Sequence, residues 1–526
     1  MLYNINLKIY YIKNMDLLLI NPGNSSKIYQ KLSNKYTAIE TPTWSLLLAN
    51  SMRKFGYDCG LIDANAENIS YEEIYERIKS YKPRLILFVV YGQNVNAGTT
   101  NMSGATSLSN YLKKMDSNLK ISYVGSHVQA LPKETLLKEK SIDFVFTNEG
   151  VYALRNILGL KSFEKEKIKN IKGIAYREID DVIINMPEDI VPSERMDIDL
   201  PGYAWDLLPM KNKPFDLYRS PMWHAEYDQN KRSPYAALQT SLGCQFGCNF
   251  CMINLINRND DDEIGVSSNY SKMRFWSPDF IIKEFDKLID YGVRTIRIVD
   301  EMFLLNPKYY IPLCEKLVER NKDDDLRMWA YSRVDTIRRP GILELVRKAG
   351  IKWLCLGIES GDKSIRLEVS KGKFEDVDIN KVIEQVHEAD IEVMANYIFG
   401  LPGDTQESIQ KTFELSLNLN TSGWNTYAAM ALPGSQLYKD AVSKGVKVPE
   451  TYEGYSFHSY DTIPLPTESL SAAEILKLRD EKFNEYHSHP KFLERIEKRF
   501  NKKAADNILE MTKIKLKRRI IEDANL

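Results

Sequence analysis

The stretch SLGCQFGCNFCMIN, residues 241–254, holds three of the six cysteines of this 526-residue chain. Cys244, Cys248 and Cys251 follow a Cys-x3-Cys-x2-Cys spacing directly after an apolar segment of strand length, AALQTSL. The other cysteines are scattered along the chain, at Cys59, Cys314 and Cys355. Clustered thiolates are typical ligands of zinc, copper(I) or iron–sulfur clusters.

The number of clustered cysteines distinguishes between these metals. Structural zinc takes four ligands, usually as two pairs, and the sequence offers no second pair; the nearest candidate is His224, well upstream. Electron-transfer clusters normally use four cysteines. A [4Fe–4S] cluster with three cysteines leaves one iron open, as catalytic zinc keeps an open position. The triplet therefore favours a cluster whose fourth iron binds a small molecule, with structural zinc as the weaker alternative.

The composition excludes several classes of protein. The chain is 43% hydrophobic and 27% charged, with a formal net charge of -1, which is ordinary for a globular protein and gives no basic footprint for nucleic acid. The longest apolar runs, such as residues 85–90, are too short to cross a bilayer. The first twenty residues lack the pattern of a signal peptide. We therefore expect a cytoplasmic protein, in which clustered cysteines bind metal rather than form disulfides.

The first 160 residues alternate between apolar stretches of strand length and amphipathic helical segments such as residues 71–81. This alternation predicts a parallel, doubly wound, Rossmann-like sheet, whose ligand lies at the carboxyl ends of the strands. No GxGxxG motif is present, so an ordinary dinucleotide site is not supported. The expected strands are residues 16–20, 57–63, 84–90, 120–125 and 144–150.

The rest of the chain divides into three parts. Residues 161–232 read as an ordered connector with a small hairpin, and its Trp223, His224 and Glu226 are candidates for a substrate pocket or for packing. Strand–helix alternation resumes at Tyr235 and gives six βα units, fewer than the eight of a closed barrel. The prediction is an α/β chain with an N-terminal sheet domain (1–160), the connector (161–232), a partial (β/α)6 TIM-like barrel (233–445) and a helical C-terminal region (446–526).

The cysteine motif and three later segments together resemble the radical S-adenosylmethionine (SAM) superfamily over residues 235–445. The segments are VDEMF (299–303), GIESG (357–361) and IFGLPGDT (398–405). The resemblance implies that Cys244, Cys248 and Cys251 ligate a [4Fe–4S] cluster, which cleaves SAM reductively to a 5′-deoxyadenosyl radical. The residues it places near SAM are Phe250, Asp300, Glu301, Arg333, Glu359, Ser360, Leu401 and Pro402.

The N-terminal sheet resembles that of the cobalamin-binding members of the same superfamily, over residues 16–158. The resemblance is carried by VGSHVQALPKETL (124–136) and IDFVFTNEGVYAL (142–154), although Asn148 replaces the first glycine of the second motif. The Asp-x-His-x-x-Gly motif that supplies a cobalt ligand in many corrinoid proteins is absent. The cobalamin contacts implied are Gly92, Gln93, Asn94, Gly125, His127, Glu149 and Gly150.

Taken together, the resemblances imply a B12-binding radical SAM enzyme that methylates an sp3 carbon of a small metabolite. The expected partners are this small-molecule substrate and a reductant such as flavodoxin or ferredoxin. Three alternatives stay open. In one, the N-terminal sheet of a radical SAM enzyme is only a substrate or partner domain. Related enzymes catalyse radical cyclisation or rearrangement, and a non-catalytic corrinoid or iron–sulfur sensor would carry the same cofactor domains.

Overall fold

The computed structural model describes residues 14–526 apart from positions 24, 93, 180, 254, 256–272, 338–340 and 371–376. Its N-terminal sheet has the strand order β2-β1-β3-β4-β5-β6-β7, and the first five strands in sequence run parallel. These strands match the predicted ones to within a few residues. They are β1 (Leu17–Asn21), β2 (Cys59–Asp63), β3 (Leu85–Val89), β4 (Ile121–Val124) and β5 (Phe144–Phe146).

Both faces of this sheet are buried, as expected for a doubly wound domain. Leu17 and Leu19 of β1 pack with helices α3 (Thr43–Lys54) and α9 (Val151–Leu158). Leu18 and Ile20 point to the other face, toward α5 (Tyr71–Tyr81) and α6 (Gly98–Met115). Shorter helices complete the domain: α1 (Ser25–Tyr29), α2 (Leu32–Lys35), α4 (Ala64–Glu67), α7 (Ser126–Ala130), α8 (Pro132–Lys138) and α10 (Lys165–Ile168).

The hairpin predicted within the connector is present but belongs to the N-terminal sheet. Strands β6 (Ile174–Glu178) and β7 (Asp181–Ile184) continue the sheet antiparallel from β5. The sheet is therefore mixed at this edge, and the domain extends past the predicted boundary at residue 160. The remaining connector contains only short helical turns, among them α11 (Met196–Asp199).

The second sheet is an open half-barrel of parallel strands in the order β15-β14-β13-β12-β11-β8. It confirms the predicted partial barrel of six βα units. The strands are β8 (Tyr235–Leu238), β11 (Thr295–Ile298), β12 (Arg327–Arg333), β13 (Ile351–Glu359), β14 (Glu392–Phe399) and β15 (Gly423–Ala428). A two-stranded ladder joins β9 (Ser241–Leu242) to β10 (Arg274–Phe275).

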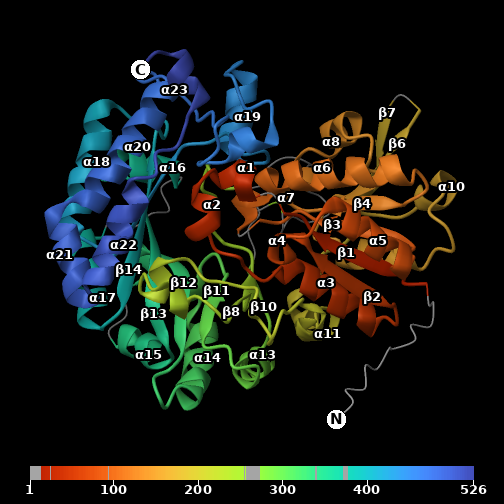
Figure 1. Ribbon diagram of the computed structural model, residues 1–526, viewed down its shortest axis with the longest axis horizontal. Helices are drawn as coiled ribbons and strands as arrows, with labels where there is room; N and C mark the ends of the chain where they lie inside the picture. The colour runs from red at the N-terminus through yellow and green to blue at the C-terminus, as the bar shows by residue number, and fades with distance from the viewer. Residues whose placement is uncertain are drawn as a thin grey trace, which may run out of the picture.

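Helices cover the outside of the half-barrel (Figure 1). Those that alternate with its strands are α13 (Pro278–Asp290), α14 (Pro307–Arg320), α15 (Ile342–Lys348), α16 (Lys363–Val369), α17 (Ile379–Glu388), α18 (Gln406–Leu419) and α19 (Gln436–Ser443). The C-terminal helices lie on the β14 side of the half-barrel in the same view. They are α20 (Ala472–Ser488), α21 (Pro490–Arg499), α22 (Lys502–Thr512) and α23 (Arg519–Asp523).

Two buried ion pairs connect the N-terminal domain to the half-barrel. Glu149, after β5, pairs with Arg274 of β10 at 2.6 Å, and both side chains are almost fully buried. Glu40, before α3, accepts two hydrogen bonds of 2.5 Å from Arg297 of β11. A single apolar core also runs from the first sheet into the barrel, so the two domains pack as one body around the space between them.

Candidate functional site

The cysteine loop, residues 243–253, begins where β8 and β9 bring the chain to the carboxyl end of the barrel. Its middle is fixed by backbone hydrogen bonds on both sides. Asn249 donates its N–H to the carbonyl of Val369 at 3.1 Å and accepts from the N–H of Leu437 at 3.0 Å. Cys244 is buried, and Cys248 and Cys251 are half-buried. The half-barrel thus holds all three thiols at its mouth.

Each of the three sulfurs has a hydrogen-bond donor directed at it. The N–H of Phe246 donates to Cys244 Sγ at 3.5 Å, the guanidinium of Arg333 donates to Cys248, and the amide of Asn96 donates to Cys251 Sγ at 3.7 Å. Donors to sulfur stabilise thiolates, which are the form that binds metal. The donor set therefore fits a metal-bound state of the triplet.

The surroundings of the thiols oppose ionisation when no metal is bound. Burial raises the pKa of Cys244 to about 12 and that of Cys248 to about 11; burial and the nearby Glu301 raise the pKa of Cys251 further. Among the described residues, no three His, Cys, Asp or Glu side chains converge tightly enough to share one metal ion. A four-iron cluster binds each thiolate to a different iron, so it does not require that convergence.

Asp300, predicted to lie near SAM, occupies a buried position at the end of β11. Its carboxylate accepts hydrogen bonds from the N–H and the hydroxyl of Thr240, both at 2.6 Å, and from the hydroxyl of Ser241 at 2.5 Å. Burial raises its pKa. These hydrogen bonds hold residues 240–241, which lead into the cysteine loop, against the end of β11. A contact between Asp300 and SAM stays a prediction.

The role of Asp300 can be tested by the variant Asp300→Ala. Removing the carboxylate leaves buried donors of Thr240 and Ser241 unsatisfied, at about 1–3 kcal/mol for each donor. We expect a lower thermal unfolding midpoint and poorer iron retention, measured by calorimetry and iron analysis. Glu301→Gln, at the half-buried neighbouring position, is the matched control and should leave the unfolding midpoint unchanged. An unchanged midpoint in Asp300→Ala combined with lost SAM affinity would instead favour the direct SAM contact.

Arg333 and Glu359 lie together beside Cys248. Arg333 forms a two-point ion pair with Asp335, and its guanidinium stacks over the ring of Phe246 at 3.7 Å from the centroid. Glu359 follows a β-bulge and has a left-handed φ of 65°. A Cβ on Gly357 would lie 2.5 Å from Glu359 Oε1, so a larger residue at position 357 would shift this carboxylate. Burial raises the pKa of Glu359 to about 7, opposed by Arg333.

The remaining residues predicted near SAM form an apolar wall and its support. Phe250 packs against a buried cluster that contains Leu401, and half-buried Pro402 follows Leu401 in the chain. Ser360 is fully buried, and its hydroxyl contacts Thr412 at 3.3 Å. The structure therefore places Phe250 and Leu401 in one apolar cluster and gives Ser360 a position inside the fold, and their contacts with SAM stay predictions.

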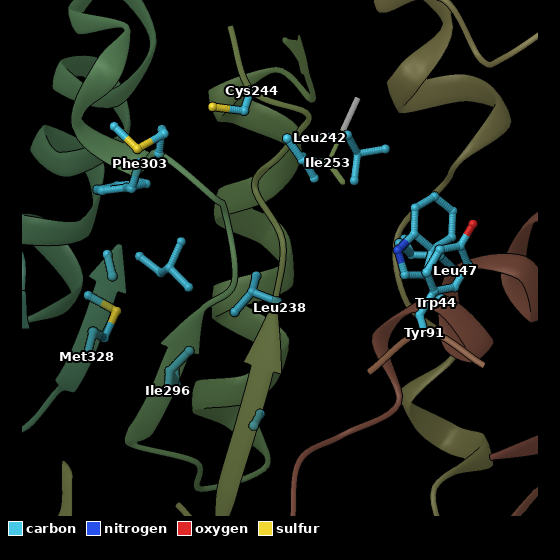
Figure 2. Close-up of a cluster of buried hydrophobic side chains, with 14 of the residues drawn as sticks. Trp44, Leu47, Tyr91, Leu238, Leu242, Cys244, Ile253, Ile296, Phe303 and Met328 are labelled. Atoms are coloured by element: carbon cyan, nitrogen blue, oxygen red, sulfur yellow. The ribbon is translucent and has the colours of Figure 1, made fainter. Parts of the chain in front are cut away.

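Two adjoining cavities, which share Trp44 and Tyr91 in their walls, lie between the carboxyl ends of the N-terminal strands and the barrel. We call the two together the interdomain cavity. Figure 2 shows Trp44 and Tyr91 side by side, across from Leu242 and Ile253. The rings of Trp44 and Tyr91 stack with their centroids 4.9 Å apart. Residues of the N-terminal domain that line it are Asn21, Asn65, Thr43, Trp44, Tyr91, Gly92 and Asn94, and those of the barrel are Ala237, Gln239, Leu242, Gly243, Val299, Asp300 and Glu301.

The walls of the interdomain cavity carry polar atoms without partners. Ser45 Oγ, Asn94 Oδ1 and Gln239 Oε1 are buried and have no hydrogen-bond partner. Buried polar groups are normally satisfied, so these atoms indicate a polar ligand. Gly92 and Asn94, predicted as cobalamin contacts, are in these walls; Gln93 lies outside the described residues. The walls thus offer both an apolar aromatic face and unsatisfied polar atoms to a ligand.

The other predicted cobalamin contacts are placed differently. Within the described part of the chain, the walls of the interdomain cavity do not include Gly125, His127, Glu149 or Gly150. His127 is buried, with Nδ1 3.1 Å from the hydroxyl of Thr99, and burial lowers its pKa to about 3. Glu149 pairs with Arg274, Gly150 is the N-cap of α9, and Gly125 follows β4 with a φ of 156°. Their cofactor contacts stay predictions.

Sequence reasoning missed Glu40, Arg297 and the aromatic pair Trp44–Tyr91. Arg297 has one signal in the sequence, because it is a charge between Ile296 and Ile298 in a buried strand. The connector residues proposed for a pocket are packed: His224 is buried, with Nε2 2.9 Å from the carbonyl of Arg327. Trp223 lies against Trp329 and Trp353 inside the barrel.

Two family models match the chain. Residues 238–416 match the radical SAM superfamily, and residues 30–158 match the B12 binding domain. These segments contain the cysteine loop and most of the N-terminal sheet, respectively. Among the described residues, no helix is long and apolar enough to cross a membrane.

Similar proteins extend over most of the chain. An uncharacterized methyltransferase of Pyrococcus horikoshii is 24% identical over 92% of this chain and 94% of its own length. An anaerobic magnesium-protoporphyrin IX monomethyl ester cyclase of Cereibacter sphaeroides is 23% identical over 83% of this chain and 65% of its own length.

Solved structures share the fold. The radical S-adenosylmethionine methyltransferase TsrM of Kitasatospora setae superposes with a TM-score of 0.61 at 14% identity, over 83% of this chain and 77% of that one. The cobalamin-dependent S-adenosylmethionine radical enzyme OxsB gives 0.64 at 14% identity, over 95% and 72%.

Proposed function

The chain is a radical SAM enzyme with an N-terminal B12-binding domain, and from this premise we propose that it methylates an sp3 carbon of a small molecule. The observation that carries the proposal is the interdomain cavity. One end of it is lined by Gly243 and Glu301 beside the cysteines, and the other by residues that follow β1 and β3. A cluster on the barrel side and a corrinoid on the sheet side would face the same space.

Residues of both domains would bind the cofactors. Cys244, Cys248 and Cys251 would hold a [4Fe–4S] cluster, and the stacked Trp44 and Tyr91 would border the corrinoid. When bound, cluster and SAM supply a 5′-deoxyadenosyl radical and cobalamin supplies a transferable methyl group.

The chain itself positions these groups and keeps water out. Phe250 and Leu401 give the SAM side an apolar wall, and Trp44 is almost fully buried. Arg333 supplies a fixed positive charge beside Cys248, because its ion pair with Asp335 and its stacking on Phe246 restrict its movement. Exclusion of water protects a reactive intermediate from side reactions.

Names of relatives support methyl transfer over other outcomes. Besides the archaeal relative, a cytidylyl-2-hydroxyethylphosphonate methyltransferase of Streptomyces wedmorensis is 22% identical over 77% of this chain. The similarity to the magnesium-protoporphyrin ester cyclase makes radical cyclisation the second candidate. The small-molecule substrate and a flavodoxin- or ferredoxin-type reductant belong to the proposal.

The proposal is tested on protein purified without oxygen from cells supplied with cobalamin. We expect about four irons and one cobalt per chain, and 5′-deoxyadenosine when SAM and a reductant are added. SAM with a deuterated methyl group should then label a product formed from a metabolite extract. A product without that label would favour cyclisation, absence of cobalt would refute methyl transfer from cobalamin, and absence of 5′-deoxyadenosine would refute radical SAM chemistry.

A further inference from the structure

Between β3 and α6, Gly92 and residues 94–97 reach both the interdomain cavity and the cysteine loop; we call these residues the β3–α6 turn. Gly92, Asn94 and Ala97 line the cavity. Asn96, in the same turn, makes two hydrogen bonds to the cysteine loop of the other domain. Its Oδ1 accepts from the N–H of Met252 at 3.2 Å, and its Nδ2 donates to Cys251 Sγ at 3.7 Å.

The orientation of the Asn96 amide is determined by its partners. A backbone N–H can only donate, so the N–H of Met252 requires the oxygen of the amide on its side. The NH2 group is then left toward the sulfur of Cys251. The N–H of Ile253 donates to the same sulfur from within the loop, so Cys251 has one donor from each domain.

Hydrogen bonds within the turn hold Asn96 in place. Ala97 donates its N–H to the carbonyl of Asn94 at 3.1 Å and accepts from the hydroxyl of Thr100 at 2.8 Å. Asn101 donates to the carbonyl of Tyr91 at 3.0 Å. A Cβ on Gly92 would lie 2.4 Å from that of Ala97, so the turn closes tightly. A ligand that displaces Asn94 or Ala97 must therefore also move Asn96.

We propose that Asn96 is a positioning residue through which the B12-binding domain raises the reduction potential of the cluster held by Cys251. Hydrogen bonds to the sulfurs are among the factors that set cluster potentials. A donor favours the reduced cluster, because reduction adds negative charge that the N–H stabilises. The inference rests on the proposed function for the presence of the cluster, but it does not depend on which reaction follows.

The test is a redox titration of the cluster in the wild type and in Asn96→Leu, followed by electron paramagnetic resonance. Leucine keeps the approximate shape and removes the donor. We expect the ratio of reduced to oxidised cluster at a fixed solution potential to fall about tenfold, which is about 59 mV for one electron. An unchanged potential in Asn96→Leu with full iron content would overturn the proposal.

Two further variants separate the hydrogen bond from the shape of the turn. Thr100→Val removes one hydrogen bond within the turn but no contact to Cys251, and should shift the potential much less than Asn96→Leu does; an equal shift there would overturn the proposal. If Asn96→Leu retains no iron, Asn96→Ser replaces it in the titration, because serine is too short to reach the sulfur. The ratio of reduced to oxidised cluster must then fall about tenfold in Asn96→Ser. A wild-type potential in Asn96→Ser would overturn the proposal. Iron content and 5′-deoxyadenosine formation by the wild type report separately on the proposed function.

Discussion

Replacing Cys244, Cys248 and Cys251 together by alanine is expected to remove all bound iron and all SAM cleavage while the chain still folds. The three thiols are neighbours at the barrel mouth, and each has its own hydrogen-bond donor. Loss of three ligands leaves no thiolate at the site to hold iron. Iron analysis, the visible absorption of the cluster and the formation of 5′-deoxyadenosine measure the effect.

The matched control replaces the other three cysteines, Cys59, Cys314 and Cys355, by alanine. All three are buried, and burial raises the pKa of Cys59 and Cys314 to about 12. The control should retain full iron and SAM cleavage, with only a modest loss of stability from the smaller side chains. Iron bound by the first triple variant, or lost from the control, would contradict the assignment of the ligands.

The sequence was sufficient to predict helices and strands that are determined by residues close together in the chain. Helix α5 spans Tyr71–Tyr81 as predicted, because Ser70 caps its first turn and Ile74 and Ile78 form one apolar stripe. The five parallel strands of the N-terminal sheet are mainly apolar runs and were found in the same way. The cysteine triplet was also identified from the sequence, because three closely spaced thiols are typical ligands of zinc, copper(I) or iron–sulfur clusters.

Contacts between distant segments could not be read from the sequence. Glu149 belongs to a motif that resembles a cofactor loop, yet its charge is paired with Arg274, 125 positions later. Asp300 follows a strand as a ligand-binding residue would, but its oxygens accept from Thr240 and Ser241. The sequence shows that such side chains lie at the carboxyl edge of a sheet; only packing determines which partner each one takes.

For the hairpin at residues 174–184, the pairing with the rest of the sheet could not be predicted from the sequence either. The hairpin was predicted, but the strand with which it pairs was not. Antiparallel pairing with β5 adds the hairpin to the N-terminal sheet. The hydrogen-bonding edge of β5 is therefore covered by the chain itself, as expected for an otherwise exposed edge strand.

Breaking the buried ion pair between Glu40 and Arg297 is expected to give a large loss of stability at the domain interface. Only 8% of the Glu40 side chain and 2% of the Arg297 side chain are exposed. Arg297 also lies over the ring of Trp329 at 4.5 Å. Burial alone would lower the pKa of the Arg297 guanidinium. The interactions with Glu40, Tyr331 and Tyr235 are together larger than this effect and raise the pKa.

Arg297→Met keeps most of the volume and leaves the Glu40 carboxylate buried without its partner. Removal of one member of a buried pair costs about 3–5 kcal/mol. Each kcal/mol lowers the melting temperature by about 2–4 °C for a domain of 150–250 residues. We therefore expect a fall of roughly 6–20 °C in the apparent midpoint, together with faster proteolysis between the N-terminal domain and the barrel.

Arg53→Met provides the comparison, because Arg53 also makes a two-point contact with a carboxylate, that of Asp206 at 2.9 Å. That pair is exposed, at 30% for Arg53 and 63% for Asp206, and exposed pairs contribute about 0–1 kcal/mol. The double variant Glu40→Gln, Arg297→Met should recover much of the loss, because it removes the uncompensated charge. Equal effects of Arg297→Met and Arg53→Met would show that the buried pair does not hold the two domains together.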